Sequence, residues 1–228
     1  MYDMPDEIVV QADGALRIVM LSRPDARNAV NGAMHRGLAR LWPRVSADPG
    51  VRAVVLTGSG AAFSVGSDDD YRSELGRDHA LRSRTIEDGR ELVLGMARCR
   101  VPVVAAVNGP AVGLGCSLVA LSDIVYIAPS AHLSYPSVDD GILADAADLL
   151  TWPLHINLTL AKQYALTGAP ISAERAVELG LANHVAHGAL VEAVHCAESI
   201  MTLPPQTVER TRRILNQPIE RAVLRALG

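Results

Sequence analysis

Residues 101–123 read VPVVAAVNGPAVGLGCSLVALSD. Within them, residues 103–107 are a continuous apolar run between a proline and an Asn-Gly pair, which is typical of a strand buried on both faces. Residues 108–115 contain three glycines and a proline, and residues 116–121 are a second apolar run, long enough for a short helix. The sequence therefore predicts a strand, a glycine-rich turn and a helix. Because the first N–H groups of a helix lack internal partners, this turn can hold a partial negative charge.

Two enzymatic interpretations compete for this turn. Gly113-Leu114-Gly115 after a strand is similar to the start of the dinucleotide-binding pattern G-x-G-x-x-G, but Leu118 occupies the third glycine position. No acidic residue ends a second strand about twenty residues later, as that pattern requires. The other interpretation is an oxyanion hole, in which N–H groups receive a carbonyl oxygen that gains negative charge. The residues favour the oxyanion hole, which needs a second donor from elsewhere in the chain.

The composition is that of a globular protein. The chain has 228 residues, of which 49% are hydrophobic and 4% aromatic, so it can bury a large core of Ala, Val and Leu. This length suits a single domain over residues 1–228, with a core of about 1–143 and a helical part of about 144–228. A net charge of −4 without a long basic run gives no indication of a nucleic-acid or membrane-surface partner.

The sequence also predicts a compartment. Its N-terminus is acidic and lacks the apolar segment of a signal peptide, and no apolar stretch is long enough to span a bilayer. Three cysteines, an odd number without the spacing of metal ligands, suit a reducing environment. We therefore expect a cytoplasmic protein.

The remaining elements follow from hydrophobic periodicity and turn residues. Two short β runs, 7–11 and 15–21, are joined through Asp13-Gly14, which is a hairpin signal. Asn31 is placed to cap a helix over about 32–47, which Pro43 is expected to kink. We further expect strands at 51–56 and 124–128, and helices at about 78–98, 144–151, 156–167, 172–180, 188–202, 205–216 and 218–227.

Five segments occur in a recognisable order. They are RPDARNA at 23–29, LTG at 56–58, AFSVGSD at 62–68, the central segment at 102–123, and residues 166–181, which begin with LTG and end with GL. Together they resemble the crotonase superfamily, the enoyl-CoA hydratase/isomerase family, over essentially the whole chain. The resemblance implies an α/β fold, a crotonase-like spiral of ββα units with a helical C-terminal region, assembled as homotrimers or hexamers. It also implies acyl-CoA thioesters as ligands, with coenzyme A as part of the substrate and no separate cofactor.

The resemblance implies the second oxyanion donor. In this family one N–H comes from the residue after the glycine of the A-F-x-x-G segment, here Ser67, and the other from the middle of the G-x-G, here Leu114. Only main-chain atoms are used, so leucine can serve at the second position, where its side chain would narrow the pocket. The alternative for Ser67 is an ordinary turn residue.

The resemblance also implies a coenzyme A site, and the matching residues are Arg27, Ala29, Ser64, Gly66 and Asp68. Main-chain groups of Ala29, Gly66 and Asp68 are expected to face the adenine or the pantetheine arm. Arg27 is expected to pair with a phosphate, since a guanidinium suits that geometry, although a solvated loop arginine is an equally good interpretation. Family members continue beyond the position of our last residue with helices that help to cover coenzyme A. We therefore expect that part of this surface is missing or comes from a neighbouring subunit.

Hydratases of this family use two glutamates to activate water, and this chain has serine at both positions. The first position is Ser117 in the central helix, and the second is Ser137 after Tyr135-Pro136. A serine hydroxyl cannot act unaided as a general base near neutral pH. We therefore expect Ser117 and Ser137 to line the pocket, and two-glutamate hydration is not predicted.

Asp145 is the best remaining candidate for proton transfer. It lies four residues after Gly141, and dienoyl-CoA isomerases and the chlorobenzoyl-CoA dehalogenase of this superfamily carry a functional aspartate at a similar place. Asp145 would move a proton at an acyl-CoA carbon as a base, or attack an activated carbon as a nucleophile. The alternative is an aspartate that only caps the next helix, and Asp148 is a similar candidate one turn later.

No metal site is expected. Residues 68–70 are consecutive aspartates whose side chains diverge and lack the spacing of a calcium loop, so we expect a solvated turn there. His184 and His187 have no evident third ligand.

Three functional hypotheses remain open at this level. The first is an enzyme of the enoyl-CoA hydratase/isomerase class, a lyase or an isomerase, with Ser67, Leu114 and Asp145 as its catalytic groups. The second is an acyl-CoA-binding subunit without catalysis. The third is a hydrolase of a carbon–carbon bond in a diketone, known in the same superfamily, for which Trp152-Pro153 is a weak hint.

Overall fold

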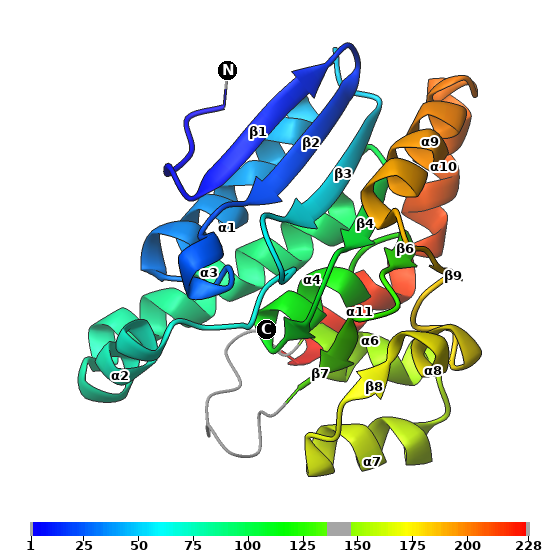
Figure 1. The fold of residues 1–228 in the computed structure, drawn as a ribbon. Coiled ribbons are helices and arrows are strands. Elements are labelled where there is room, and N and C mark those ends of the chain that lie inside the picture. Colours follow the sequence, from blue (N-terminus) through cyan, green and yellow to red (C-terminus); the bar gives the residue numbers. More distant parts are fainter. Residues whose placement is uncertain (1, 136–146, 227–228) are drawn as a thin grey trace.

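The computed structural model describes residues 2–135 and 147–226. Its main sheet has six strands in the order β1-β2-β3-β4-β6-β9 (Figure 1). The strands are β1 (Ile8–Asp13), β2 (Leu16–Leu21), β3 (Ala53–Gly58), β4 (Val103–Val107), β6 (Ile124–Ile127) and β9 (His184–Val185). Only β1 and β2 pair in antiparallel fashion, and every other neighbour in this sheet is parallel. A parallel sheet needs cover on both faces.

The hairpin at the start of the chain forms as the sequence predicts. Strands β1 and β2 pair from Ile8 with Leu21 to Asp13 with Leu16, and Gly14 lies in the turn with a φ of +54°. Glycine adopts this left-handed conformation without the steric cost that other residues have. The strand predicted at 51–56 is also present as β3, displaced by two residues.

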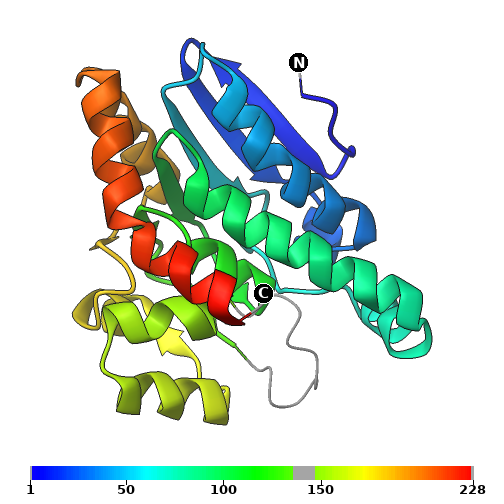
Figure 2. The ribbon, with the colours of Figure 1, turned by 180° about the vertical axis from the view of Figure 1, so that it is seen from behind.

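Both faces of the sheet are buried, by helices from different parts of the chain. Val54 and Leu56 of β3 belong to the core that includes α1 (Gly32–Ala47) and α3 (His79–Arg98), while Ala53 and Val55 pack with alanines of α9 (Ala189–Met201). Figure 2 shows α1 and α3 side by side in front of the sheet, with α9 on its other face. The period of two along a strand therefore produces two apolar faces, which explains why β3 reads as one apolar run.

Helix α1 begins as predicted. The side chain of Asn31 accepts a hydrogen bond from the amide of Met34 at 2.9 Å, which satisfies one of the N–H groups left open at a helix start. The helix continues through Pro43 to Ala47. It buries an apolar face that includes Leu38 and Trp42.

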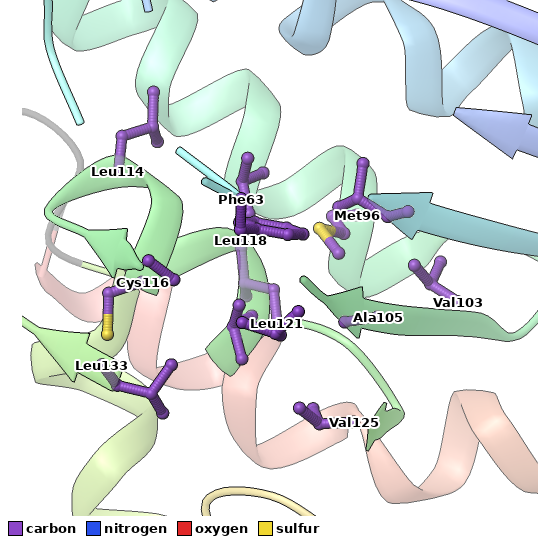
Figure 3. Close-up of a cluster of buried hydrophobic side chains, with 14 of the residues drawn as sticks. Phe63, Met96, Val103, Ala105, Leu114, Cys116, Leu118, Leu121, Val125 and Leu133 are labelled. Carbon is purple, nitrogen blue, oxygen red and sulfur yellow. The ribbon is translucent and has the colours of Figure 1, made fainter. Parts of the chain in front are cut away.

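A small second sheet lies beside the central helix. It consists of β5 (Ala111–Val112), β7 (His132–Ser134) and β8 (Ile171–Ser172), and α4 (Leu114–Ala120) follows directly on β5. Figure 3 shows Leu118 and Leu121 gathered with Phe63 and Met96 between this helix and the main sheet. The predicted order of strand, turn and helix over residues 101–123 is confirmed, with β5 as an addition.

The C-terminal part of the described chain is mostly helical, as predicted. Its helices are α6 (Ala147–His155), α7 (Leu158–Thr167), α8 (Ala173–Glu178), α9, α10 (Pro205–Leu215) and α11 (Gln217–Ala226). The helix predicted at 144–151 is the least accurate, because α6 continues to residue 155. Strands β7, β8 and β9 were not predicted, since runs of two or three residues carry too little periodicity.

One buried arginine ties α10 to the rest of the fold. The Nε of Arg212 donates to Oδ2 of Asp123 at 2.7 Å, and its terminal nitrogens donate to main-chain oxygens at the end of α3, including that of Met96 at 2.9 Å. The same Asp123 oxygen accepts the amide of Val103 at the start of β4, also at 2.7 Å. Arg212 is 5% exposed, so this ion pair lies in the interior.

The expectation of a solvated turn at residues 68–70 is wrong. A further helix, α2 (Asp69–Arg77), begins there, and Asp68 caps it by accepting from the amides of Asp70 and Tyr71. This helix was not predicted because its sequence has no clear apolar face. Only Tyr71 and Leu75 are buried along it.

Candidate active site

The loop that carries Ser67 is held from one side by Val30. The amide of Val30 donates to Gly66 O at 2.7 Å, and the amide of Asp68 donates to Val30 O at 2.9 Å, which makes a short parallel bridge. Since successive N–H groups of an extended chain point to opposite sides, the N–H of Ser67 points away from Val30. Gly66 has a φ of +88°, a conformation that favours glycine.

The second segment turns from β5 into α4 at Gly113. This glycine has φ +53° and ψ −120°, and its amide donates to Ser134 O at 3.0 Å. The helix begins at the next residue, Leu114, whose amide has no acceptor within the helix. Figure 3 shows the Leu114 side chain directed away from Leu118 and Leu121.

The two segments meet at their glycines. A Cβ on Gly66 would lie 2.9 Å from Val112 O, and a Cβ on Gly113 would lie 3.7 Å from Gly66 Cα. The residues directly before Ser67 and Leu114 are therefore in contact. Within residues 2–135 and 147–226, neither of these two amides donates a hydrogen bond.

Ser64 joins the two segments from the inside. Its fully buried hydroxyl donates to Asn28 O at 2.8 Å and accepts from the amide of Gly66 at 3.2 Å. Its carbonyl oxygen accepts the amide of Val112 at 2.9 Å, and a Cβ on Gly115 would lie only 2.6 Å from that oxygen. Ser64 thus positions the loop, and its contact with coenzyme A stays a prediction.

Asn28 is a residue of this site that sequence reasoning missed. It is fully buried with a φ of +57°, and its side chain uses all four of its hydrogen-bonding positions. Oδ1 accepts from the amide of Arg23 at 2.9 Å and from Ser59 Oγ at 3.2 Å, while Nδ2 donates to the carbonyl oxygens of Ser59 and Ala62, both at 2.8 Å. Asn28 therefore fastens the early loop to the loop after β3. Its place in RPDARNA is the one signal in the sequence.

The remaining predicted coenzyme A residues surround this loop. Arg27 is exposed in a left-handed conformation, with φ +51°, and its guanidinium pairs with no residue in the described part of the chain. Ala29 is buried, and its carbonyl oxygen accepts from Arg23 at 2.6 Å. The main-chain groups of Gly66 and Asp68 bond to Val30, as described above. The structure brings all these residues together, and their contact with coenzyme A stays a prediction.

The carboxylate of Asp68 is paired with Arg23. Asp68 Oδ2 lies 3.0 Å from Arg23 Nη1, and both side chains are largely buried, at 19% and 25% exposure. Burial alone raises the pKa of Asp68, but hydrogen bonds from Arg23 and from the first amides of α2 outweigh it, so this pKa lies below its ordinary value.

Of the three remaining predicted site residues, only Ser117 lies in the part of the chain that the structure describes. Ser117 is on α4, three residues after Leu114, and its side chain is fully buried. Ser137 and Asp145 lie outside the described residues, so their expected parts stay predictions.

Neither a metal site nor a membrane-spanning helix occurs in the part of the chain that the structure describes. No group of three or more His, Cys, Asp or Glu side chains that could hold a metal ion occurs in residues 2–135 and 147–226. In the same ranges, none of the helices combines the length and the apolar character needed to cross a bilayer.

The fold is that of the crotonase superfamily. The chain superposes on the crystal structure of an enoyl-CoA hydratase/isomerase from Mycobacterium paratuberculosis with a TM-score of 0.97 and 65% sequence identity, covering 99% of this chain and 91% of that chain.

The sequence comparisons define the family. The family model described as enoyl-CoA hydratase/isomerase matches residues 11–227, and the chain belongs to this family. A Thermus thermophilus protein named "Putative enoyl-CoA hydratase" is 35% identical over 212 residues, which cover 89% of this chain and 81% of that protein. Enoyl-CoA hydratase EchA19 of Mycobacterium tuberculosis is 30% identical over 216 residues, covering 93% and 81%.

Proposed function

We propose that this protein is an enzyme that acts on an acyl-CoA thioester and stabilises its enolate with the main-chain amides of Ser67 and Leu114. The observation that supports the proposal is the close approach of Gly66 and Gly113, which directly precede two amides that donate no hydrogen bond in the described part of the chain. Family membership supports the acyl-CoA ligand.

The chemistry follows from two fixed donors. When a proton leaves the carbon next to the thioester carbonyl, negative charge develops on the carbonyl oxygen. Two N–H groups already aimed at that oxygen stabilise the charge without reorganisation, and the loss of one such donor typically costs about 10²–10³ in kcat. The backbone bridge to Val30 and the conformation of Gly113 hold the segments that carry these two donors.

Proton transfer is assigned to Asp145. A carboxylate is suited to this step, whereas the hydroxyls of Ser117 and Ser137 are not and would line the pocket. Coenzyme A is assigned to the loop around Arg27, Ala29 and Gly66, with the unpaired guanidinium of Arg27 available for a phosphate.

The experiment is an assay with crotonyl-CoA that follows the absorbance of its conjugated thioester, beside a titration with coenzyme A. Turnover that Asp145→Asn abolishes and Asp140→Asn preserves supports the proposal, because the two carboxylates occupy neighbouring positions of one segment. Turnover that Asp145→Asn leaves unchanged removes the base assignment. Sedimentation of the same sample tests the expected trimer or hexamer.

A second candidate is acyl-CoA binding without catalysis. It is favoured by the buried Ser117, which stands at a family glutamate position and supplies no base. Tight binding of crotonyl-CoA without turnover of any acyl-CoA would support it. No binding of coenzyme A at all would favour the hydrolase of a carbon–carbon bond in a diketone.

A further inference from the structure

We propose that Arg23 and Asp68 are positioning residues for the Ser67 amide, and that the Asp68 carboxylate serves this purpose rather than ligand binding. The inference rests on the proposed function, in which that amide polarises the thioester. Arg23 precedes Val30 in the chain and Asp68 follows Ser67, and Val30 and Ser67 form the bridge. The pair is a feature that the sequence did not single out.

Arg23 holds the loop before the bridge. Its Nη1 donates to Ala29 O at 2.6 Å and to Asp68 Oδ2 at 3.0 Å, so one nitrogen joins the residue before Val30 to the residue after Ser67. The main chain of Arg23 is itself fixed, because its amide donates to Asn28 Oδ1 and its carbonyl oxygen accepts the amide of Asn28, both at 2.9 Å. The guanidinium therefore extends from an anchored position.

Asp68 holds the residue directly after the amide. Its main-chain amide donates to Val30 O at 2.9 Å, and Oδ1 caps α2 by accepting from Asp70 at 3.1 Å and Tyr71 at 3.3 Å. Oδ2 is then left for Arg23. Both carboxylate oxygens are thus occupied by internal donors.

The peptide that carries the Ser67 N–H needs this support. It follows Gly66, whose backbone is permissive, so the orientation of the peptide is set by what holds its neighbours. Misplacement of a catalytic group by about 1 Å can cost about 10²-fold in rate. Arg23 also neutralises the carboxylate of Asp68, the residue directly after the proposed donor Ser67. An unpaired negative charge there would oppose the negative charge that develops on the thioester oxygen.

The test compares Arg23→Met with a matched control, Arg17→Met. Arg17, whose side chain is 13% exposed, also pairs with an aspartate, Asp48, at 3.5 Å, and that carboxylate is 32% exposed. That aspartate follows the last residue of α1, whereas the bridge residue Val30 lies before the first residue of this helix, 18 positions earlier in the sequence. Two readouts are used: hydrogen exchange of the peptide 64–72, and kcat and KM with the acyl-CoA that the enzyme accepts.

We expect Arg23→Met to raise exchange in residues 64–72 and to lower kcat about tenfold or more, with KM changed less than about threefold. Arg23→Lys keeps one cationic nitrogen that can donate to both oxygens and should restore part of kcat and of the protection. Arg17→Met should leave both readouts near wild type. Asp68→Asn keeps the cap but loses the charge pair, so it should resemble Arg23→Met in exchange.

Two outcomes would overturn the inference. One is unchanged exchange at residues 64–72 in Arg23→Met; the other is an equal effect of Arg17→Met, which would show general loosening of the fold. If wild-type protein turns over no acyl-CoA, the proposed function fails, and the exchange comparison between the two arginine variants still decides whether the pair positions this loop.

Discussion

The candidate site and the C-terminal helices are attached to the sheet by different means. Around the site, the early loop and the loop after β3 are joined by many short hydrogen bonds, with Asn28 bonding residues 31 and 34 positions away. Helix α10 instead depends on Arg212, whose partners lie 89 to 116 positions away along the chain. A distributed network resists the loss of one bond, whereas a single buried ion pair concentrates its effect in one residue. This difference predicts where single substitutions act most strongly.

The largest expected effect is at Arg212. Arg212→Met removes the guanidinium from Asp123 and from the end of α3, leaving a largely buried carboxylate without its cation, and should lower the unfolding free energy by about 4 kcal/mol. Arg213→Met changes the adjacent, exposed residue of α10 and should stay within about 0.5 kcal/mol of wild type. Chemical denaturation measures both. Equal stabilities for the two variants would show that α10 is held by its apolar contacts.

Asn28 tests the distributed side of the comparison. Asn28→Ala removes four hydrogen bonds and leaves buried carbonyl and amide groups unpaired, so we expect a loss of about 3 kcal/mol. Asn28→Gly should remove the same bonds while relieving the left-handed backbone, at φ +57°. Asn31→Ala removes only a helix cap and should cost about 1 kcal/mol. If Asn28→Ala lowers the unfolding free energy no more than this control does, the other hydrogen bonds between the two loops are sufficient to hold them together.

The same contrast explains what the sequence predicted. Residues 101–123 combine periodicity with glycines at the turn, so strand, turn and helix were all readable. The family resemblance supplied Ser67 and Leu114 as candidate donors, and that role stays a prediction. These features depend on neighbouring residues and on the main chain. The hairpin at Gly14 and the cap at Asn31 were readable for the same reason.

The features that were missed depend on distant partners. Arg212 stands in a polar helix, and nothing near it in the sequence indicates Asp123 as its partner. The four bonds of Asn28 and the pairing of Arg23 with Asp68 are equally invisible, because spacing along the chain does not report which loops meet. Helix α2 was missed since it buries only two of its residues.

Alanine substitutions at three glycines with positive φ distinguish two costs to stability. One is the cost of the backbone conformation, and the other is the cost of a close contact with the added Cβ. Gly14→Ala should cost about 1 kcal/mol from its left-handed backbone alone, because a Cβ there would meet nothing within 4 Å. Gly66→Ala adds a contact of 2.9 Å with Val112 O and should cost more. Gly113→Ala has room, at 3.7 Å, but φ +53° with ψ −120° lies outside the left-handed helical region that alanine can adopt, so it should cost more than Gly14→Ala.

Activity should also separate Gly14 from the other two glycines. Gly66→Ala and Gly113→Ala each change the residue before a proposed oxyanion donor, so both should lower kcat about tenfold or more, whereas Gly14→Ala should not. Thermal unfolding ranks the three variants by stability, and steady-state kinetics ranks them by kcat. A normal kcat in Gly113→Ala would argue against Leu114 as a donor.

The smallest expected effect is the acid dependence of the Arg23–Asp68 pair. The folded-state pKa of Asp68 lies below its ordinary value, because hydrogen bonds from Arg23 and the amides of α2 outweigh the effect of burial. The carboxylate therefore contributes stability that is present above its unfolded pKa of about 3.9 and is lost as the pH falls through the lower folded value. Unfolding free energies of wild type and Asp68→Asn should differ most near pH 7, and the difference should shrink as the pH falls through the lowered folded pKa of Asp68. A difference independent of pH would show that Asp68 acts through its cap on α2, which asparagine retains, and not through its charge.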